Sequence, residues 1–368
     1  MGHQYMRESV AIVGVGAVTP VGLTAPETAA SVRAGVSRFM ETPFVGSSLE
    51  PIVMAFLDEL LIPPPDPVIP DFPGISRRQV RMLQLAGSAA REAVGGNTGD
   101  GSIPVLLSVP EHEAGDELLT NPDLLNLLTL QSGLDLDLGA SRMYAKGRAG
   151  GILAISDAVN RLGQRPESLV LVGGVDSFFD HTLLTRLDAE GRVSSSENLD
   201  GFIPGEGAGF LLLTSIEMAK RDGLNVLGVV DGVASAVETG HRYSEEPYRG
   251  DGLSECFATL FRESTDAEPV RTVYAGFNGE SYDAKQWAVA HIRNSDHICE
   301  PLALEHPADC FGDAGAAMGT LLVVVSALAL TEGYREGPCL DWCTSDYGDC
   351  GAVTLSSFDV GSNPSEAP

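Results

Sequence analysis

Residues 200–213 read DGFIPGEGAGFLLL, a run of small residues around Glu206 that is followed by an apolar segment. The small residues are Gly205, Gly207, Ala208 and Gly209. Glycine and alanine allow two backbone segments to approach where a larger side chain would clash. The stretch therefore predicts closely packed layers, in which Gly205, Glu206, Gly207 and Gly209 specify the fold and perform no chemistry.

On both sides of this stretch, segments typical of strands alternate with segments typical of helices. Apolar runs predict strands at residues 10–13, 103–109, 169–172, 226–237, 270–277 and 352–356. Helical periodicity or small-residue composition predicts helices at residues 77–94, 147–162, 252–262 and 315–330. We expect the first strand to end in a turn at Gly14 and Gly16. The alternation predicts an α/β layered fold, and its repetition predicts two similar halves.

Composition excludes several classes of function. The formal net charge is −28, and lysine occurs only at positions 146, 220 and 285, so no concentrated basic face is available for nucleic acid. The longest apolar stretch, residues 316–330, is too short to cross a bilayer, so we expect a cytoplasmic protein without membrane insertion. None of the six cysteines forms a CxxC pair, so the sequence predicts no metal site, and we expect no cofactor.

Four stretches together resemble the β-ketoacyl synthase branch of the thiolase-fold superfamily. They are VAIVGVGAVTPVGLTAPETAASVRAGVSRF (10–39), LVLVGGVDSFFD (169–180), DGFIPGEGAGFLLL (200–213) and GDAGAAMGTLLVVVSALAL (312–330). The resemblance spans the chain nearly from end to end and implies a thiolase-like layered α-β-α-β-α fold. It divides the chain into ketosynthase-like halves at residues 1–245 and 246–360. The glycine, serine, proline and glutamate in residues 361–368 predict a flexible tail. Gly315 joins the fold-specifying glycines because its helix packs between two sheets.

The resemblance also implies where catalytic residues would stand, and this chain departs from the pattern at each position. Arg148, in GRAGG, occupies the place of the nucleophilic cysteine at the N-terminus of a buried helix. Asn278 stands at the first histidine, Gly312 at the second, and Pro307 at the usual lysine. The resemblance therefore implies a catalytically degenerate member of this branch, because arginine carries no nucleophile and the two histidine positions hold no imidazole. We therefore expect no condensing activity.

A charged Arg148 at a buried helix N-terminus needs a carboxylate partner, for which Glu206 or Asp176 would serve. A Cys/His pair made from Cys310 and His306 is an alternative nucleophilic site outside the matched positions. The two residues lie four apart in a segment that Pro307 interrupts, so the sequence leaves their separation undefined.

Three functions are compatible with these residues. The first is a non-catalytic adaptor, scaffold or accessory protein; the RAGVSRF phrase resembles ketosynthase-like proteins encoded beside type VI secretion effectors, which implies a role in effector loading. The second is a chain-length-factor-like subunit, which shapes an apolar tunnel inside a heterodimer. The third is a residual acyltransferase of fatty-acid or polyketide synthesis that uses Cys310. The resemblance implies a homodimer, and each function requires a protein partner, which is an effector, an adaptor or a synthase subunit.

Overall fold

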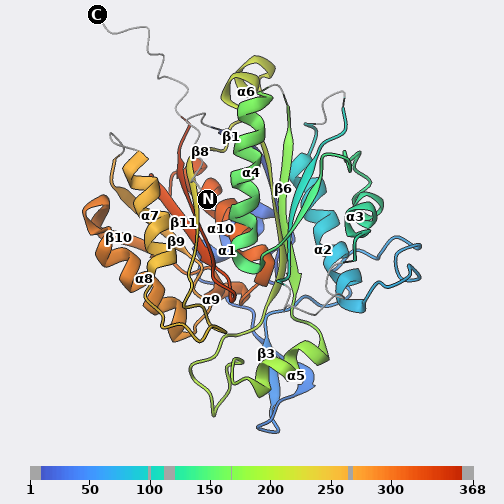
Figure 1. Ribbon diagram of the computed structural model, residues 1–368. Helices are drawn as coiled ribbons and strands as arrows, with labels where there is room; N and C mark the ends of the chain where they lie inside the picture. Colours follow the sequence, from blue (N-terminus) through green and yellow to red (C-terminus); the bar gives the residue numbers. More distant parts are fainter. Residues whose placement is uncertain (1–9, 98–100, 112–120, 167, 264–267, 359–368) are drawn as a thin grey trace, which may run out of the picture.

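The computed structural model describes residues 10–97, 101–111, 121–166, 168–263 and 268–358, so the predicted tail at residues 361–368 lies outside the described residues. Most of the described strands form one mixed sheet (Figure 1). In spatial order these strands are β10 (Ile298–Glu305), β9 (Val270–Ala275), β11 (Cys339–Thr344), β12 (Asp349–Ser356), β8 (Gly228–Val237), β1 (Val10–Val18), β7 (Glu206–Ser215), β6 (Val170–Ser177), β4 (Val105–Val109) and β5 (Arg142–Ala145). A separate hairpin joins β2 (Met40–Val45) to β3 (Pro51–Met54).

The sheet contains the same strand pattern twice. From β1 outward, β7 and β6 pair antiparallel and β4 and β5 pair parallel. From β8 outward, β12 and β11 pair antiparallel and β9 and β10 pair parallel. The two series meet where β1 pairs antiparallel with β8. In this order β8 stands with the later strands, and the division at residues 245 and 246 stays a prediction.

Helices form three layers around the sheet. The described helices are α1 (Ala25–Arg33), α2 (Arg77–Val94), α3 (Leu124–Ser132), α4 (Gly150–Gln164), α5 (His181–Ala189), α6 (Ile216–Asp222), α7 (Asp251–Glu263), α8 (Ser281–Arg293), α9 (Ala308–Phe311) and α10 (Met318–Thr331). In Figure 1, α2 and α3 cover one side, α7 and α8 cover the other, and α4 and α10 lie between them. The predicted α-β-α-β-α layering is confirmed.

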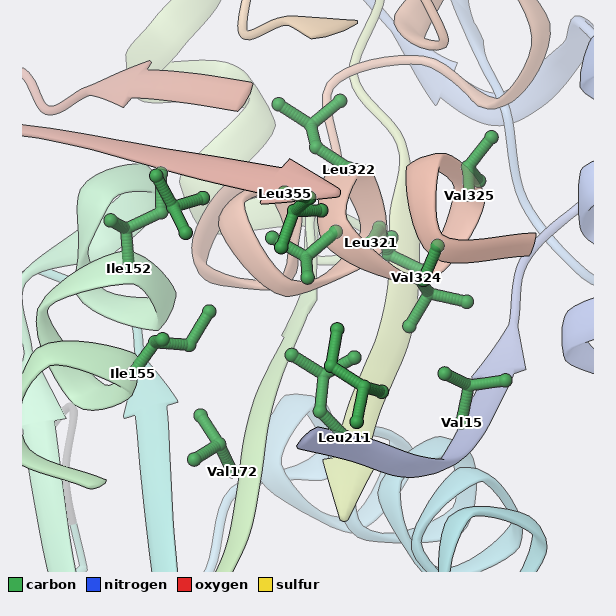
Figure 2. Close-up of a cluster of buried hydrophobic side chains, with 14 of the residues drawn as sticks. Val15, Ile152, Ile155, Val172, Leu211, Leu321, Leu322, Val324, Val325 and Leu355 are labelled. Atoms are coloured by element: carbon green, nitrogen blue, oxygen red, sulfur yellow. The ribbon is translucent and has the colours of Figure 1, made fainter. Parts of the chain in front are cut away.

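The central layer is the largest apolar core. Side chains of α4 and α10 meet those of β1, β6, β7 and β12 there, and Figure 2 shows Ile152, Leu321, Leu211 and Leu355 converging from these elements. Helix α10 is buried over nearly its whole length, because it packs against strands of both halves of the sheet. Its composition, with leucine, valine and alanine on all faces, is what such a position requires.

The predicted end of the first strand is wrong. Strand β1 continues through Gly14 and Gly16 to Val18. A Cβ atom at Gly14 would lie 2.0 Å from the carbonyl oxygen of Ala93, and one at Gly16 would lie 2.0 Å from that of Ala89. Both alanines belong to α2, so these glycines let the helix backbone rest against the strand and do not form a turn.

Both central helices begin in a tight turn. A 3₁₀ turn at Gly147–Ala149 precedes α4, and a second at Gly315–Ala317 precedes α10. The backbone at Gly319 approaches the carbonyl oxygen of Arg148, since a Cβ placed there would lie 2.9 Å from it. The fold thus brings the N-terminal ends of both helices to one place.

Among the described residues, no helix combines the length and the apolar character that spanning a membrane requires.

Candidate functional site

Arg148 lies in the turn that precedes α4, and its side chain is buried, with 6% of the residue exposed. Its Nε donates to Oδ2 of Asp313 at 2.8 Å, and Nη2 donates to the same carboxylate. Its Nη1 donates to Oδ1 of Asp346 at 3.0 Å. Burial lowers the pKa of this guanidinium, but the two carboxylates more than offset that effect and raise it above its ordinary value. Arg148 therefore stays charged at any physiological pH.

Asp313 joins two of the predicted positions. It is fully buried, and besides Arg148 it accepts a hydrogen bond from Nδ2 of Asn278 at 3.1 Å. The same Nδ2 donates to Oε2 of Glu280 at 2.9 Å, while the other Asp313 oxygen accepts from the backbone N–H of Gly315 at 2.9 Å. The amide nitrogen of Asn278 thus donates to two carboxylates, which accounts for both of its hydrogens.

A second arginine extends the network toward the surface. Arg192, which lies after α5, forms a bidentate pair with Glu280 at 3.1 and 2.7 Å and contacts both oxygens of Asp346. Arg242 donates to Glu280 at 2.9 Å and lies 3.3 Å from Asp346. Asp346 is therefore shared by three guanidinium groups. Although burial alone would raise the pKa of Asp346, these cations hold it well below its usual value.

The predicted partners of Arg148, Glu206 and Asp176, are wrong. Glu206 pairs with Arg81 at 2.6 and 2.7 Å, and Asp176 pairs with Arg78 at 2.6 Å. Both arginines lie in the first turns of α2, where a capping box at Ser76 starts the helix beside the ends of β6 and β7. A carboxylate partner does exist, as predicted, but loops after α9 and β11 provide it.

Two further acidic groups near the network are shifted toward neutrality. Burial, reinforced by repulsion from Asp346, raises the pKa of Glu111 to about 7, although Arg148 opposes this effect. Glu111 accepts hydrogen bonds from the backbone N–H groups of Asp346 and Tyr347. Burial likewise raises the pKa of Asp283 to about 7. Both groups thus titrate near neutral pH next to permanently charged arginines.

The other predicted residues do not join the network. Gly312 has a φ of 72° and packs against the carbonyl oxygens of Ile203 and Pro204, and Pro307 caps the short helix α9. Cys310 packs in the central core, where burial raises its pKa to about 11. His306 packs on the ring of Phe277, and its buried Nε2 has no hydrogen-bond partner among the described residues. Within the described residues, no hydrogen bond joins the side chains of Cys310 and His306.

The fold-specifying glycines lie at close contacts near the site. Added Cβ atoms at Gly205 and Gly209 would lie 2.4 Å from the Phe311 carbonyl oxygen and 2.9 Å from the Leu321 nitrogen. One at Gly207 would lie 3.1 Å from the Val18 carbonyl oxygen, and one at Gly315 would lie 2.1 Å from Oδ2 of Asp176. The described residues contain no cluster of histidine, cysteine and carboxylate side chains suited to a metal ion.

A cavity of about 90 Å³ opens beside Arg148. Its lining is mainly polar, with arginines and carboxyl groups from α2, β6, α5, the turn before α4 and the loop after β11, and the turn before α10 contributes Gly315 and Ala316. Drug-sized ligands occupy cavities of about 300–1,000 Å³. The space next to Arg148 is therefore suited to a small polar group.

No family model matches this chain. It is 28% identical over 281 residues to polyketide synthase ThaG of Burkholderia thailandensis, covering 70% of this chain but 5% of that protein. It is 23% identical over 229 residues to 3-oxoacyl-[acyl-carrier-protein] synthase 2 of Staphylococcus aureus, covering 58% of this chain and 55% of that enzyme. The ishigamide ketosynthase/chain length factor superposes with a TM-score of 0.76 at 17% identity, covering 96% of this chain and 100% of that one.

This chain has a thiolase-like ketosynthase fold. The chain spans about half of the length of the Staphylococcus aureus enzyme and a small fraction of polyketide synthase ThaG. The resemblance to the β-ketoacyl synthase branch, which four sequence stretches indicated, is confirmed at the level of the fold.

Within this ketosynthase fold, sequence reasoning missed the carboxylates that hold Arg148. Asp313 directly follows Gly312, and Asp346 lies in the loop TSDYGD after β11. The sequence could have indicated Asp313, because in GDAGAA it directly follows Gly312, which was already assigned to the second histidine position. For Asp346, Arg192 and Glu280, no local pattern distinguishes the side chain from an ordinary surface charge.

Proposed function

We propose that this chain is a non-catalytic ketosynthase-fold protein that acts as an adaptor, scaffold or accessory protein. The observation that carries the proposal is the ion-pair network that Arg148 forms with Asp313 and Asp346 at the head of α4. The nucleophile of a thioester-transfer enzyme must be a thiolate or a similar group, and a guanidinium offers no lone pair for attack. The place that the resemblance gives to the nucleophile holds only a fixed cation.

The site also lacks the hydrogen-bond donors that would stabilise an oxyanion. Asn278 directs its amide nitrogen to Glu280 and Asp313, and Asp313 itself is a hydrogen-bond acceptor when ionised. Removing one oxyanion donor costs about 100-fold to 1,000-fold in turnover in enzymes that depend on it. An enolate at this position would face carboxylate oxygens, so the geometry supports a protein without condensing activity.

The neighbouring thiols do not replace the nucleophile. Burial raises the pKa of Cys310 to about 11, and it also raises the pKa of the fully buried Cys343, although Arg148 opposes the shift at Cys343. Reactive cysteines have a depressed pKa and access to substrate. These observations argue against the residual acyltransferase.

Acyl transfer to the protein tests this proposal. We expect no increase in intact mass after incubation with a ¹⁴C-acetyl or malonyl thioester of an acyl carrier protein, while an active 3-oxoacyl-[acyl-carrier-protein] synthase 2 becomes labelled in parallel. Peptide mapping would locate any label, and the Cys310→Ser and Cys343→Ser variants would show which thiol carries it. A stoichiometric adduct that one of these variants abolishes would overturn the non-catalytic role.

Type VI secretion effector loading is the context that we propose for this adaptor, on the basis of the RAGVSRF resemblance, and it places the protein in the cytoplasm. We also propose a homodimer, supported by the position of β5 at the sheet edge directly before the turn that holds Arg148. Analytical ultracentrifugation should give twice the chain mass of 38.7 kDa. A monomer at micromolar concentration contradicts the dimer, and affinity capture from the native cell that yields carrier proteins and no effector contradicts the secretion role.

A chain-length-factor-like subunit is the second candidate, and the similarity to the ishigamide ketosynthase/chain length factor favours it. Such a subunit needs an apolar tunnel for a growing chain. The cavity beside Arg148 measures about 90 Å³ and is lined by charged groups, so it does not provide that tunnel. Co-expression with a ketosynthase from the same genome discriminates between the candidates, since only this second function predicts a stable heterodimer.

A further inference from the structure

Another cavity lies away from Arg148, between the β2–β3 hairpin and the loop that follows α5. It measures about 260 Å³, and we call it the hairpin pocket. Pro51 and Val53 of β3 line one side, and Val193 with residues 194–196 lines the other. In Figure 1, the hairpin and α5 project together beyond the main sheet, at the bottom of the view. The hairpin pocket is therefore separate from the site around Arg148.

The hairpin pocket is preformed. The backbone N–H of Ser47 donates to Oδ2 of Asp188 at 2.7 Å, and the hydroxyl of Ser196 donates to Oε2 of Glu50 at 2.8 Å. These hydrogen bonds join the hairpin to α5 and to the loop after it. Side chains of the same elements form a small core of their own, which includes Ile52, Met54, Leu184, Leu187, Val193 and Phe202. Because both sides of the pocket are fixed, binding there needs little further ordering.

The hairpin pocket is negatively charged. The charged side chains that line it are Glu50 and Asp188. The hydrogen bonds that they accept come from a backbone N–H and a hydroxyl, which are both neutral. Within the described residues, no arginine or lysine forms an ion pair with either carboxylate. The two arginines nearest to Asp188 in sequence have other partners, since Arg186 pairs with Glu190 and Arg192 belongs to the buried network described above.

The tip of the hairpin presents apolar side chains to solvent. Leu49 is 86% exposed, and Val45 is 57% exposed. Leu49 has a φ of 62°, and among the described residues other than glycine it alone has a positive φ. A side chain with a Cβ rarely adopts this conformation, because the Cβ comes too close to a carbonyl oxygen. Since Leu49 buries almost no apolar surface within the chain, a strained and exposed leucine here indicates a contact outside the chain.

The size and the lining of the hairpin pocket suit one basic side chain. Its volume lies below the range of about 300–1,000 Å³ that drug-sized ligands occupy. Arginine and lysine pack their methylene groups on apolar surface and extend a cation beyond it. Pro51 and Val193 offer that surface, while Oε1 of Glu50 and Oδ1 of Asp188 accept no hydrogen bond from the part of the chain that the structure describes.

We propose that the hairpin pocket and the adjoining Leu49 bind a basic segment of a partner protein. One arginine or lysine side chain enters the pocket toward Glu50 and Asp188, and an apolar side chain of the same segment covers Leu49. The net charge of −28 favours the approach of a basic partner. This inference rests on the proposed function, because an adaptor requires a partner, and it gives that partner a chemistry.

Fluorescence anisotropy with the full chain tests this surface. The probe is a fluorescein-labelled peptide, GSLRALRALGS, in about 150 mM NaCl, where surface charges are screened over about 8 Å. A second peptide carries glutamine in place of each arginine. We expect saturable binding of the arginine peptide with a Kd of about 10–500 µM, and binding at least about tenfold weaker for the glutamine peptide. No saturation with the arginine peptide, or equal affinities of the two peptides, would overturn the proposal.

Two double variants separate the pocket from the overall charge. Glu50→Gln combined with Asp188→Asn keeps both hydrogen-bond acceptors and removes two negative charges, so the affinity for the arginine peptide should fall about fivefold to 30-fold. Glu217→Gln combined with Asp296→Asn is the matched control, because both carboxylates are exposed, lie outside the pocket lining and give the same change of charge. The control should bind as the unmodified chain does. Equal losses in both double variants would mean that the peptide responds to net charge alone and that the pocket is not its site.

Leu49→Ala tests the apolar contact. We expect its affinity for the arginine peptide to fall about threefold to tenfold, while Tm stays within about 2 °C of the unmodified value, because the leucine packs on nothing in the free chain. Leu60→Ala is the control, since Leu60 is 93% exposed and lies outside the pocket lining. Equal affinities of these two variants would contradict the role of Leu49 in docking.

None of these binding results bears on acyl transfer, so the non-catalytic role would stand even if the peptide did not bind. Conversely, a thioester adduct on a cysteine would overturn the proposed function, and the anisotropy measurements would still decide whether the hairpin pocket binds a basic segment.

Discussion

Arg148 keeps its charge although it is almost fully buried, because Asp313 and Asp346 accept the hydrogen bonds that water would otherwise accept. Removing one member of a buried ion pair leaves its partner as an uncompensated charge and costs about 3–5 kcal/mol. We expect Arg148→Met to lower the free energy of unfolding by that amount, chiefly through the fully buried Asp313. Urea denaturation followed by circular dichroism measures the change.

Two variants make that measurement specific. In Arg148→Met combined with Asp313→Asn, the charge left behind is neutralised, so most of the stability should return. Arg271→Met is the control for an exposed pair, since Arg271 lies 3.5 Å from Glu268 and 3.6 Å from Glu336 at the surface, and it should cost less than about 1 kcal/mol. A loss of the same size in Arg148→Met and Arg271→Met would contradict a structural role for the buried arginine.

The raised pKa of Glu111 predicts a pH-dependent change in the stability of the folded protein. Its pKa is raised to about 7 in the folded protein, so between pH 4.5 and 7 the folded state holds a proton that the unfolded state has released. The stability that this carboxyl contributes is present below about pH 4.5 and is lost as the pH rises through about 7. In Glu111→Gln this loss is absent, so the variant should gain about 1–3 kcal/mol relative to the unmodified chain between pH 5 and 7.5.

The comparison of unfolding free energies at several pH values tests this directly, and other titrating groups such as Asp283 cancel because both proteins contain them. A difference that is constant from pH 5 to 7.5 would show that Glu111 is already ionised in the folded protein at the lower end of this range.

At the residue scale, the sequence identified Arg148 and Asn278 but not the carboxylates that pair with them. Arg148 and Asn278 could be assigned from local motifs. Asp313 and Asp346, however, lie 165 and 198 residues from Arg148 in sequence, and nothing in a single sequence indicates which distant carboxylate a loop will direct inward. The same limit explains why Glu206 and Asp176 were chosen in error, since their arginines, Arg81 and Arg78, came from α2.

At the scale of elements, glycines were the main source of both success and error. The small-residue composition of residues 200–213 and 315–319 correctly indicated close packing, as the contacts of Gly209 with Leu321 show. Inside β1, however, the same composition was interpreted as the end of a strand. Glycine is depleted in strands on average, but here it allows a helix backbone to approach the sheet.

Gly315 allows this packing argument to be tested apart from backbone conformation. Its φ is 51°, and an added Cβ would lie 2.1 Å from Oδ2 of Asp176. Gly35 has a similar φ of 65°, but nothing lies within 4 Å of an added Cβ. We expect Gly35→Ala to cost about 1 kcal/mol, the conformational penalty alone. Gly315→Ala should cost at least about 3 kcal/mol, because strain and overpacking add to that penalty.

Thermal and urea unfolding of the two variants give the comparison. Equal losses of stability would mean that the turn before α10 relaxes to accept a methyl group, and that Gly315 is needed for its backbone conformation alone.

At the scale of the whole molecule, repetition made the fold predictable. Strands and helices recur in the same order in both parts of the chain, and the sheet repeats one pattern of antiparallel and parallel pairing on each side of the β1–β8 contact. Edge elements such as β5 and the β2–β3 hairpin are short and partly exposed, and they carry no periodic apolar signal, so the sequence did not reveal them.

The net charge of −28 is also a property of the whole molecule, and it leads to a last prediction. An excess of like charge destabilises the compact state through mutual repulsion, and salt screens exposed charges over about 10 Å at 0.1 M. The buried pairs of Arg148 and Arg192 are screened far less, so added salt should remove repulsion without weakening the core network. Scanning calorimetry should therefore show Tm rising by about 2–6 °C between about 20 mM and 500 mM NaCl. KCl should give the same shift, because the effect depends on ionic strength and not on the cation. A falling Tm would mean instead that exposed ion pairs, such as Arg293 with Asp251, stabilise the protein by more than its acidic surface destabilises it.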